Sequence, residues 1–247
     1  MKMQGVDGDA ALEIIKALQD DDRTNPDDLI KIEWSFLPIF DQHNGASPKF
    51  LEFKLAENPA FFCEIIRIVF KSNKVEQPSE ETHDEVIKIA QNAYDLLRKW
   101  KTPPGSQRDG SFDGELLYSW LEFVKNTCSE SGHLEIAMTM IGHVMIHTPP
   151  DPDGLWIHHS AANVLNSTDA IDMRNGFQTE LFNSRGVHSW TAGKEEKMLS
   201  DQYGRMAEEV EIRGYISFAV TLRNLADSYA RDSESEAAKD PLDDWAH

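Results

Sequence analysis

Histidines and aspartates gather in a stretch that lacks fixed positive charge. Between Asn126 and Met173 the chain has no Lys or Arg but five of its nine histidines. His143 and His147 are four residues apart, a spacing used by zinc-binding helices, and Asp151 and Asp153 follow in the next loop. Imidazoles and carboxylates are ligands that zinc accepts. These four residues, His143, His147, Asp151 and Asp153, could therefore form the metal site of a hydrolase or phosphohydrolase.

Two features favour a structural role for the same stretch. Val144 stands where the HExxH class of metalloproteases has its glutamate general base. The segment Pro-Pro-Asp-Pro-Asp-Gly that follows is typical of a tight corner, in which Asp153 would cap the next helix. A His-Asp dipeptide of the helical phosphohydrolase type occurs at His83-Asp84, but a helix-capping box accounts for it. We therefore expect a packed corner, and the metal-dependent hydrolase is the alternative.

A second group of polar and aromatic side chains lies in a predicted loop between two helices. Asn183, Arg185, His188 and Trp190 fall within eight residues, and loops of this kind often carry binding residues. A groove around them could bind a protein or peptide. In the structural interpretation, Gly186 ends the preceding helix and Trp190 packs into the core.

The charge balance disfavours nucleic-acid binding. The chain has 24 Lys and Arg against 43 Asp and Glu, a formal net charge of −19, and no basic stripe. A phosphate backbone would be repelled. An acidic mimic of nucleic acid fits the sign of this charge and is a further alternative.

The cysteines and the hydropathy indicate a cytoplasmic protein. Cys63 and Cys128 lie in apolar helical contexts and are expected to be buried, reduced thiols. No apolar stretch approaches the roughly 20 residues that a membrane span needs. We expect no cofactor, no nucleic-acid partner and no membrane partner.

The apolar periodicity is helical almost throughout and predicts about eleven helices with no strand. Asn25-Pro26, Ser47-Pro48 and Asn58-Pro59 each combine a capping position with a proline at the first helical turn. Pro38 should kink the first of these helices or end it. Ser111 or Asp113 should start another helix. Later helices are expected at about 134–147, 155–165, 169–184, 194–211 and 212–231, with a possible break at Gly214.

Short connections between these helices imply antiparallel neighbours. The fold class is therefore predicted to be all-α, with irregular antiparallel helical hairpins in a solenoid-like or orthogonal arrangement. We expect one domain over residues 1–231, with a soft internal boundary near 102–111. Residues 232–247 are acidic and poor in apolar side chains, so a disordered tail is expected there.

Two strings of the sequence carry a resemblance. His147-Thr-Pro-Pro-Asp-Pro-Asp-Gly-Leu-Trp156 and the Asn-Ser-Arg-Gly-Val string that begins at Asn183 resemble, as a pair, the C-terminal helical region of large uncharacterised bacterial multidomain proteins. The resemblance runs from about Leu29 to Arg231 and implies no activity. It implies that the chain is a piece or a relative of a C-terminal module in a multidomain assembly. We therefore expect a helical protein–protein interaction module in a bacterial cell, whose partner is another protein or the remainder of a larger polypeptide.

Overall fold

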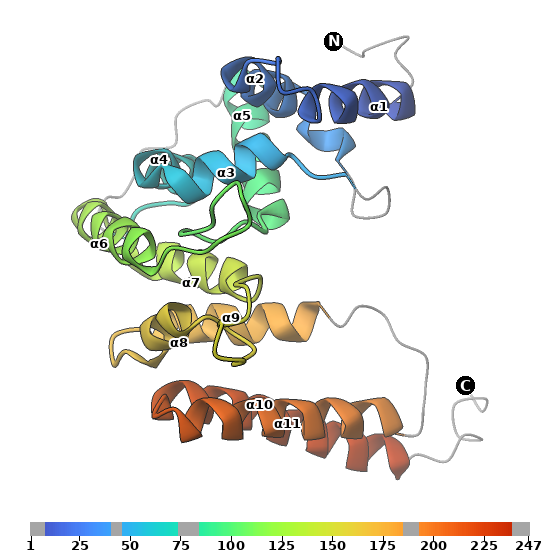
Figure 1. The fold of residues 1–247 in the computed structure, drawn as a ribbon, viewed down its shortest axis with the longest axis vertical. Helices are drawn as coiled ribbons and strands as arrows, with labels where there is room; N and C mark the ends of the chain where they lie inside the picture. The colour runs from blue at the N-terminus through green and yellow to red at the C-terminus, as the bar shows by residue number, and fades with distance from the viewer. Residues whose placement is uncertain (1–7, 41–45, 74–83, 185–192, 239–247) are drawn as a thin grey trace. The chain divides into compact units, whose positions relative to one another are not determined.

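The described part of the chain is built from helices. The computed structural model describes residues 8–40, 46–73, 84–184 and 193–238 (Figure 1). These ranges contain eleven α-helices, one 3₁₀ helix and no strand, apart from an isolated bridge between Ser106 and Phe112. The prediction of an all-α fold is confirmed. None of the described helices is both long and apolar enough to cross a membrane.

The starts of three helices in the first part of the chain follow the predicted capping signals. Its helices are α1 (Gly8–Gln19), α2 (Pro26–Ser35), the 3₁₀ helix η1 (Leu37–Ile39), α3 (Lys49–Glu57), α4 (Pro59–Val69), α5 (Asp84–Lys99) and α6 (Gly114–Ser131). The Asn25 and Asn58 side chains accept hydrogen bonds from backbone N–H groups at the starts of α2 and α4. Asp113 caps α6 in the same way. The cap predicted at Ser47-Pro48 is wrong, because Pro48 itself takes the cap position of α3. Pro38 lies in η1, so α2 ends before it, as predicted.

The later helices differ from the prediction mainly at one start. They are α7 (Leu134–Met145), α8 (His159–Asn166), α9 (Ile171–Asn183), α10 (Lys194–Ile212) and α11 (Ile216–Ala237). Helix α8 was expected from about Leu155, but the Asp151 N–H donates to the Leu155 carbonyl (2.8 Å) and closes a turn there. The predicted break at Gly214 is present, and its φ of +88° favours glycine.

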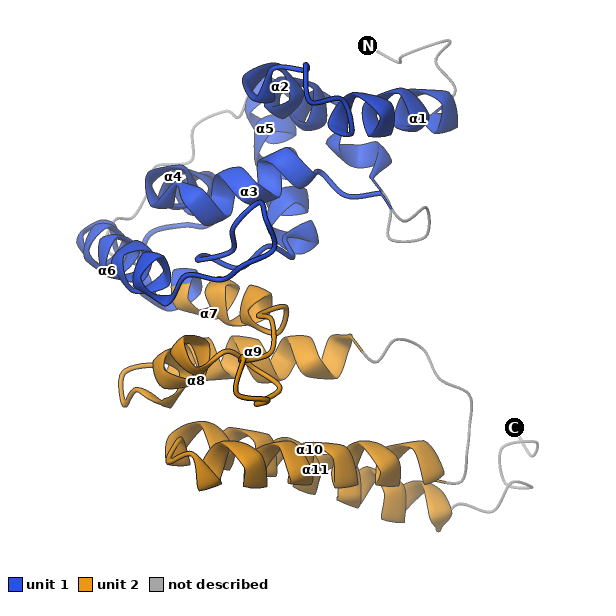
Figure 2. Ribbon diagram, in the orientation of Figure 1, with its two compact units in different colours: residues 1–137 blue, residues 138–247 orange. Residues whose placement is uncertain are grey.

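The described chain divides into two compact units, residues 1–137 and 138–247, with the division inside α7 (Figure 2). We call them unit 1 and unit 2. The soft boundary expected at 102–111 lies within unit 1. There the Asp113 N–H donates to the Gly105 carbonyl (2.8 Å), and Gly105 has a φ of +95°. This bond fastens the loop to the start of α6.

Unit 1 is organised around α4, which packs against α3, α5 and α6. The Phe62 ring of α4 lies 5.4 Å from the Trp100 ring and 5.0 Å from the Trp120 ring. Fully burying an apolar side chain such as Phe62 contributes about 1.5–3 kcal/mol. The Trp120 indole N–H donates to the Leu55 carbonyl (3.2 Å), which joins α6 to α3.

A buried carboxylate fixes the start of α3. Pro48, at the cap position of α3, makes no side-chain capping bond. The fully buried Glu33 of α2 takes over this role, because it accepts from the backbone N–H of Leu51 (2.8 Å) and of Phe50 (3.2 Å). The Gln19 side chain donates to the same carboxylate (2.6 Å). Glu33 thus connects α1, α2 and α3.

Unit 2 contains the α10–α11 hairpin, whose two helices run antiparallel and side by side (Figure 1). Tyr203 of α10 and Tyr229 of α11 stack at 5.7 Å inside it. A second aromatic group joins Trp156, Phe177 and Phe218, with ring separations from 5.2 to 6.4 Å. Four of these five rings, those of Phe177, Tyr203, Phe218 and Tyr229, are buried in the unit 2 core.

The last helix continues into the predicted tail. Helix α11 ends at Ala237, although the sequence predicted disorder from residue 232. The Ser233 hydroxyl donates to the Gly193 carbonyl (2.7 Å), and the Gly193 N–H donates to the Glu236 carboxylate (3.1 Å). These long-range bonds hold the end of α11 against the start of α10. The rest of the predicted tail, 239–247, lies outside the described residues.

Candidate functional site

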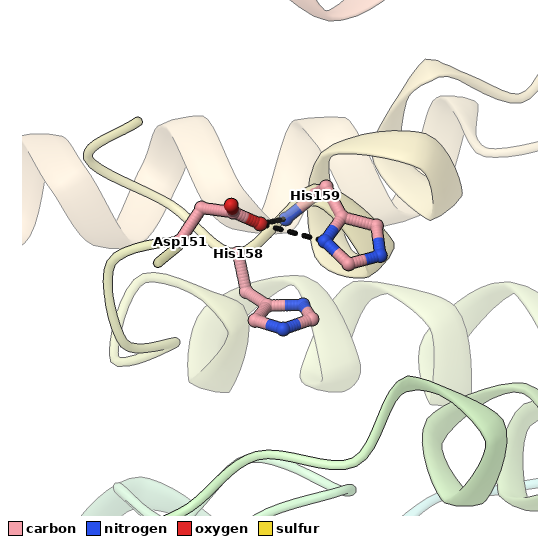
Figure 3. A group of neighbouring side chains, drawn as sticks. All are labelled: Asp151, His158 and His159. Atoms are coloured by element: carbon pink, nitrogen blue, oxygen red, sulfur yellow. Dashed lines mark hydrogen bonds and ion pairs between the residues drawn. The ribbon is translucent and has the colours of Figure 1, made fainter. Parts of the chain in front are cut away.

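The Pro-Asp corner between α7 and α8 is organised by one acidic side chain, Asp151. Its backbone carbonyl accepts from the Gly154 N–H (2.9 Å), and its Oδ1 accepts from the Asp153 N–H (2.9 Å). Its Oδ2 accepts from both the backbone N–H (2.8 Å) and the ring Nδ1 (2.6 Å) of His159 (Figure 3). Asp151 therefore caps the first turn of α8 and closes the preceding turn with the same carboxylate.

The capping residue was predicted to be Asp153, and the structure corrects this. Asp153 is exposed and takes part through its backbone, whereas the Asp151 side chain is buried. The turn between Asp151 and Leu155 directs the first aspartate inward. His158 adds a second cap, because its Nδ1 accepts from the Ser160 N–H (3.2 Å).

The electrostatics of the corner favour an ionised aspartate beside a neutral histidine. Burial raises the pKa of Asp151, but hydrogen bonds from Asp153 and His159 outweigh that effect and lower the pKa to about 2. Burial lowers the pKa of His158, and the neighbouring His159 lowers it further. His158 is therefore neutral near pH 7, and because its Nδ1 accepts a hydrogen bond, its proton is on Nε2.

Asp151, His158 and His159 are the one group of three possible metal ligands that the described residues bring together. Two ligands of one tetrahedral zinc ion lie about 3.3 Å apart when each is about 2.0–2.1 Å from the metal. The 2.6 Å separation of Asp151 Oδ2 and His159 Nδ1 is a hydrogen-bond distance instead. His158 also uses its accepting nitrogen within the cap. The arrangement fits a helix cap better than a metal centre.

The set predicted for a metal site is not brought together in the described residues. Of its four members, only Asp151 belongs to the three-residue group. His143 is half-buried in α7, and burial lowers the pKa of its imidazole despite the opposing charge of Glu180. His147 and Asp153 are exposed.

Replacing Asp151 by alanine is expected to destabilise unit 2 by about 2 kcal/mol, because the backbone N–H of His159 at the start of α8 and that of Asp153 in the preceding turn lose their acceptor. Asp153→Ala is the matched control and should change stability by less than about 0.5 kcal/mol, since that side chain is exposed. Urea unfolding, with hydrogen exchange of α8 peptides, measures both. If zinc raised the Tm of the wild-type protein and not of Asp151→Ala, a metal centre would replace the cap assignment.

The predicted binding loop lies mostly outside the described residues. Asn183 is the last residue of α9 and is exposed. Arg185, His188 and Trp190 fall within 185–192, which the structure does not describe. Just before this segment, Phe182 lines a mostly polar hollow of about 390 Å³ between α9 and α11.

An apolar groove of about 410 Å³ lies in unit 1 among α2, α3 and α4, and we call it the α2–α4 groove. Leu51 and Ile65 are buried, while Trp34 and Phe61 are half-buried and Ile68 remains 43% exposed. A groove with apolar lining and a few polar groups is the usual form of a binding site.

Charged side chains line the groove beside this apolar surface. The Lys54 ammonium lies 4.7 Å from the centre of the Phe61 ring, a cation–π distance. Lys31 is exposed and pairs with Asp28 within its own helix, at 3.0 Å. Glu64 is the acidic member of the lining. The groove therefore offers two ammonium groups and one carboxylate to an occupant.

The spacing of the apolar residues in α4 is a sequence signal for this groove. Helix α4 has two apolar stripes, since Phe61, Ile65 and Ile68 follow the i, i+4, i+7 spacing while Phe62 and Ile66 follow a second line. The second stripe is buried in the unit 1 core. A helix with two apolar faces needs a second neighbour or exposes one face.

Known proteins provide no match that could guide the interpretation of these sites. No family model, curated protein or solved structure matches the chain.

Proposed function

We propose that the protein is a helical interaction module, and that unit 1 binds an apolar segment of a partner in the α2–α4 groove. The partner is another protein or the remainder of a larger polypeptide. The observation that carries this proposal is the groove itself, where Ile68 and the half-buried rings of Trp34 and Phe61 meet over a floor of buried side chains. Apolar surface of this kind, with a polar rim, is typical of protein interaction sites.

The occupant that fits best is an amphipathic segment with acidic side chains flanking its apolar face. The apolar face would fill the space between Trp34 and Ile68, displacing water from both. Acidic side chains would lie near Lys31 and Lys54, which give the lining more positive than negative charge within a chain of net charge −19. Docking of an amphipathic helix in an apolar groove is a recurring mode of peptide recognition.

A second apolar surface supports the same function. The first turns of α5 are exposed on every side, and Val86, Ile87 and Ile89 are 52%, 43% and 44% exposed. The last turns of the helix pack in the unit 1 core through Ala93 and Leu96. A helix that is anchored at one end and carries exposed apolar side chains at the other is suited to contact a partner.

Replacing Ile68 by glutamate is expected to weaken peptide binding about tenfold, because a carboxylate would enter the apolar wall of the groove. The probes are two fluorescein-labelled amphipathic peptides with the same apolar face, one with an acidic and one with a basic polar face. The acidic peptide should bind the wild-type protein more tightly, as measured by fluorescence anisotropy.

Val220→Glu in α11 is the matched control, since Val220 is similarly exposed (48%) but lies in unit 2. It should bind the acidic peptide as the wild-type protein does. Equal affinity for Ile68→Glu and the wild-type protein would contradict the groove assignment. Saturable binding of neither peptide would count against the proposed occupant and the module together.

A further inference from the structure

The two cysteines of the chain lie against each other in the unit 1 core. Cys63 of α4 and Cys128 of α6 are 65 residues apart in sequence, yet their Sγ atoms are 3.6 Å apart. Both side chains are fully buried and both thiols are free. The prediction that both cysteines are buried is confirmed.

This geometry is close to that of a disulfide. An S–S bond is about 2.05 Å long, so the two sulfur atoms need to approach by about 1.5 Å. The chain contains no third cysteine, so an intramolecular bond can join only these two residues. The helices that carry them pack directly against each other within unit 1.

The two thiols are not equivalent. The Cys128 S–H donates to the Cys63 sulfur. This bond lowers the pKa of Cys63 against the effect of burial, and the nearby Arg67 charge lowers it further. The same bond and burial raise the pKa of Cys128. Because the thiolate is the reactive form of cysteine, Cys63 is the nucleophile of the pair.

We propose that Cys63 and Cys128 form an oxidation site that takes a hydroperoxide, and that the product is a disulfide linking α4 to α6. The Cys63 sulfur attacks one peroxide oxygen, the O–O bond breaks, and the other oxygen leaves with the Cys63 proton as water or an alcohol. The Cys128 sulfur then attacks the Cys63 sulfenic acid, the S–O bond breaks, and water leaves with the Cys128 proton. Two thiols are oxidised and one peroxide is reduced.

Burial determines which oxidants can react. With both side chains fully buried, the oxidant reaches Cys63 only during local opening of unit 1. Hydrogen peroxide, the smallest member of its class, needs the least opening. Once the sulfenic acid forms, the adjacent Cys128 captures it before a second peroxide arrives. This inference rests on the cysteine pair alone and is independent of the α2–α4 groove.

The test is to treat the folded wild-type protein with hydrogen peroxide under native conditions and then titrate thiols after denaturation. The titre is expected to fall from two thiols to none, while no disulfide forms between chains and each chain loses the mass of two hydrogens. A non-reducing peptide map should join the peptides of Cys63 and Cys128, and dithiothreitol should restore both thiols. Retention of both thiols, a sulfinic acid on Cys63, or an intermolecular dimer would each overturn the proposal.

Three variants test the assigned roles. Cys128→Ser keeps an O–H donor beside Cys63, whereas Cys128→Ala removes the donor. Cys63 should therefore form a dimedone-reactive sulfenic acid about tenfold faster in Cys128→Ser than in Cys128→Ala. In Cys63→Ala, the remaining Cys128 should react more slowly than Cys63 does in Cys128→Ser. Equal rates in all three variants would remove Cys63 as the nucleophile. The circular dichroism of each variant shows whether it has folded.

Discussion

Replacing Gly176 by alanine is expected to lower the free energy of unfolding of unit 2 by about 3 kcal/mol or more. A Cβ atom at Gly176 of α9 would lie 2.1 Å from the Thr139 carbonyl oxygen of α7. A Cβ at Gly142 of α7 would in turn lie 2.0 Å from the Met173 carbonyl oxygen of α9. The two backbones touch at this crossing, so rotation of a side chain cannot relieve either clash. The helices would have to separate.

Gly204→Ala is the matched control for this prediction. Gly204 lies within α10 of the same unit, and a Cβ there would meet no atom within 4 Å. Alanine favours a helix over glycine by up to about 1 kcal/mol, so this variant should be slightly more stable than the wild-type protein. Urea unfolding and hydrogen exchange of α7 and α9 peptides measure both variants. A Gly176→Ala variant as stable as Gly204→Ala would show that the crossing is not tight.

The elements that could be predicted are those whose signals are local. Asn58-Pro59 starts α4 and Pro38 ends α2, because a cap and a missing N–H act within one helical turn. The start of α8 was predicted incorrectly, since Asp151 and Leu155 close a turn that interrupts an otherwise helical apolar pattern. The close approach at Gly142 was not predicted, because it depends on how α7 and α9 pack together.

The candidate sites were predictable only in part, for a similar reason. The sequence identified the Pro-Asp corner but not which aspartate turns inward, since Asp151 and Asp153 stand in nearly the same local context. The apolar stripe that contains Phe61 and Ile68 was visible in the spacing. That α2 and α3 border this stripe without covering it is a property of the assembled unit. The predicted loop residues Arg185 and Trp190 lie outside the described residues, and their binding role stays a prediction.

Glu52 of α3 is the buried acid with the largest expected effect on how the stability of unit 1 depends on pH. Its side chain is 3% exposed, and its Oε2 accepts from the Lys101 N–H (2.9 Å) and the Thr102 hydroxyl (3.1 Å). Its Oε1 is buried and has no hydrogen-bond partner among the residues that the structure describes. Burial raises the pKa of Glu52 to about 7, although these hydrogen bonds and the Lys101 charge lower it and the Glu33 charge raises it. The folded protein therefore favours a neutral Glu52.

Glu52→Gln is expected to remove most of the fall in stability between about pH 4.5 and 7. In this window the folded protein keeps a proton that the unfolded chain, with a pKa near 4.5, has released, so the free energy of unfolding of wild-type unit 1 decreases as the pH rises. This decrease in the free energy of unfolding is about 3 kcal/mol at pH 8, and there is no decrease below pH 4.5. Glutamine carries no titrating proton. Glu33, whose pKa burial also raises, keeps a smaller dependence of stability on pH in this variant.

Urea unfolding across the pH range measures the free energy of unfolding of both proteins. The control is Glu57→Gln, at the exposed end of the same helix. If the free energy of unfolding of Glu52→Gln fell with pH as steeply as that of the wild-type protein, Glu52 would be ionised in the folded protein. A water molecule would then be the hydrogen-bond partner of its Oε1.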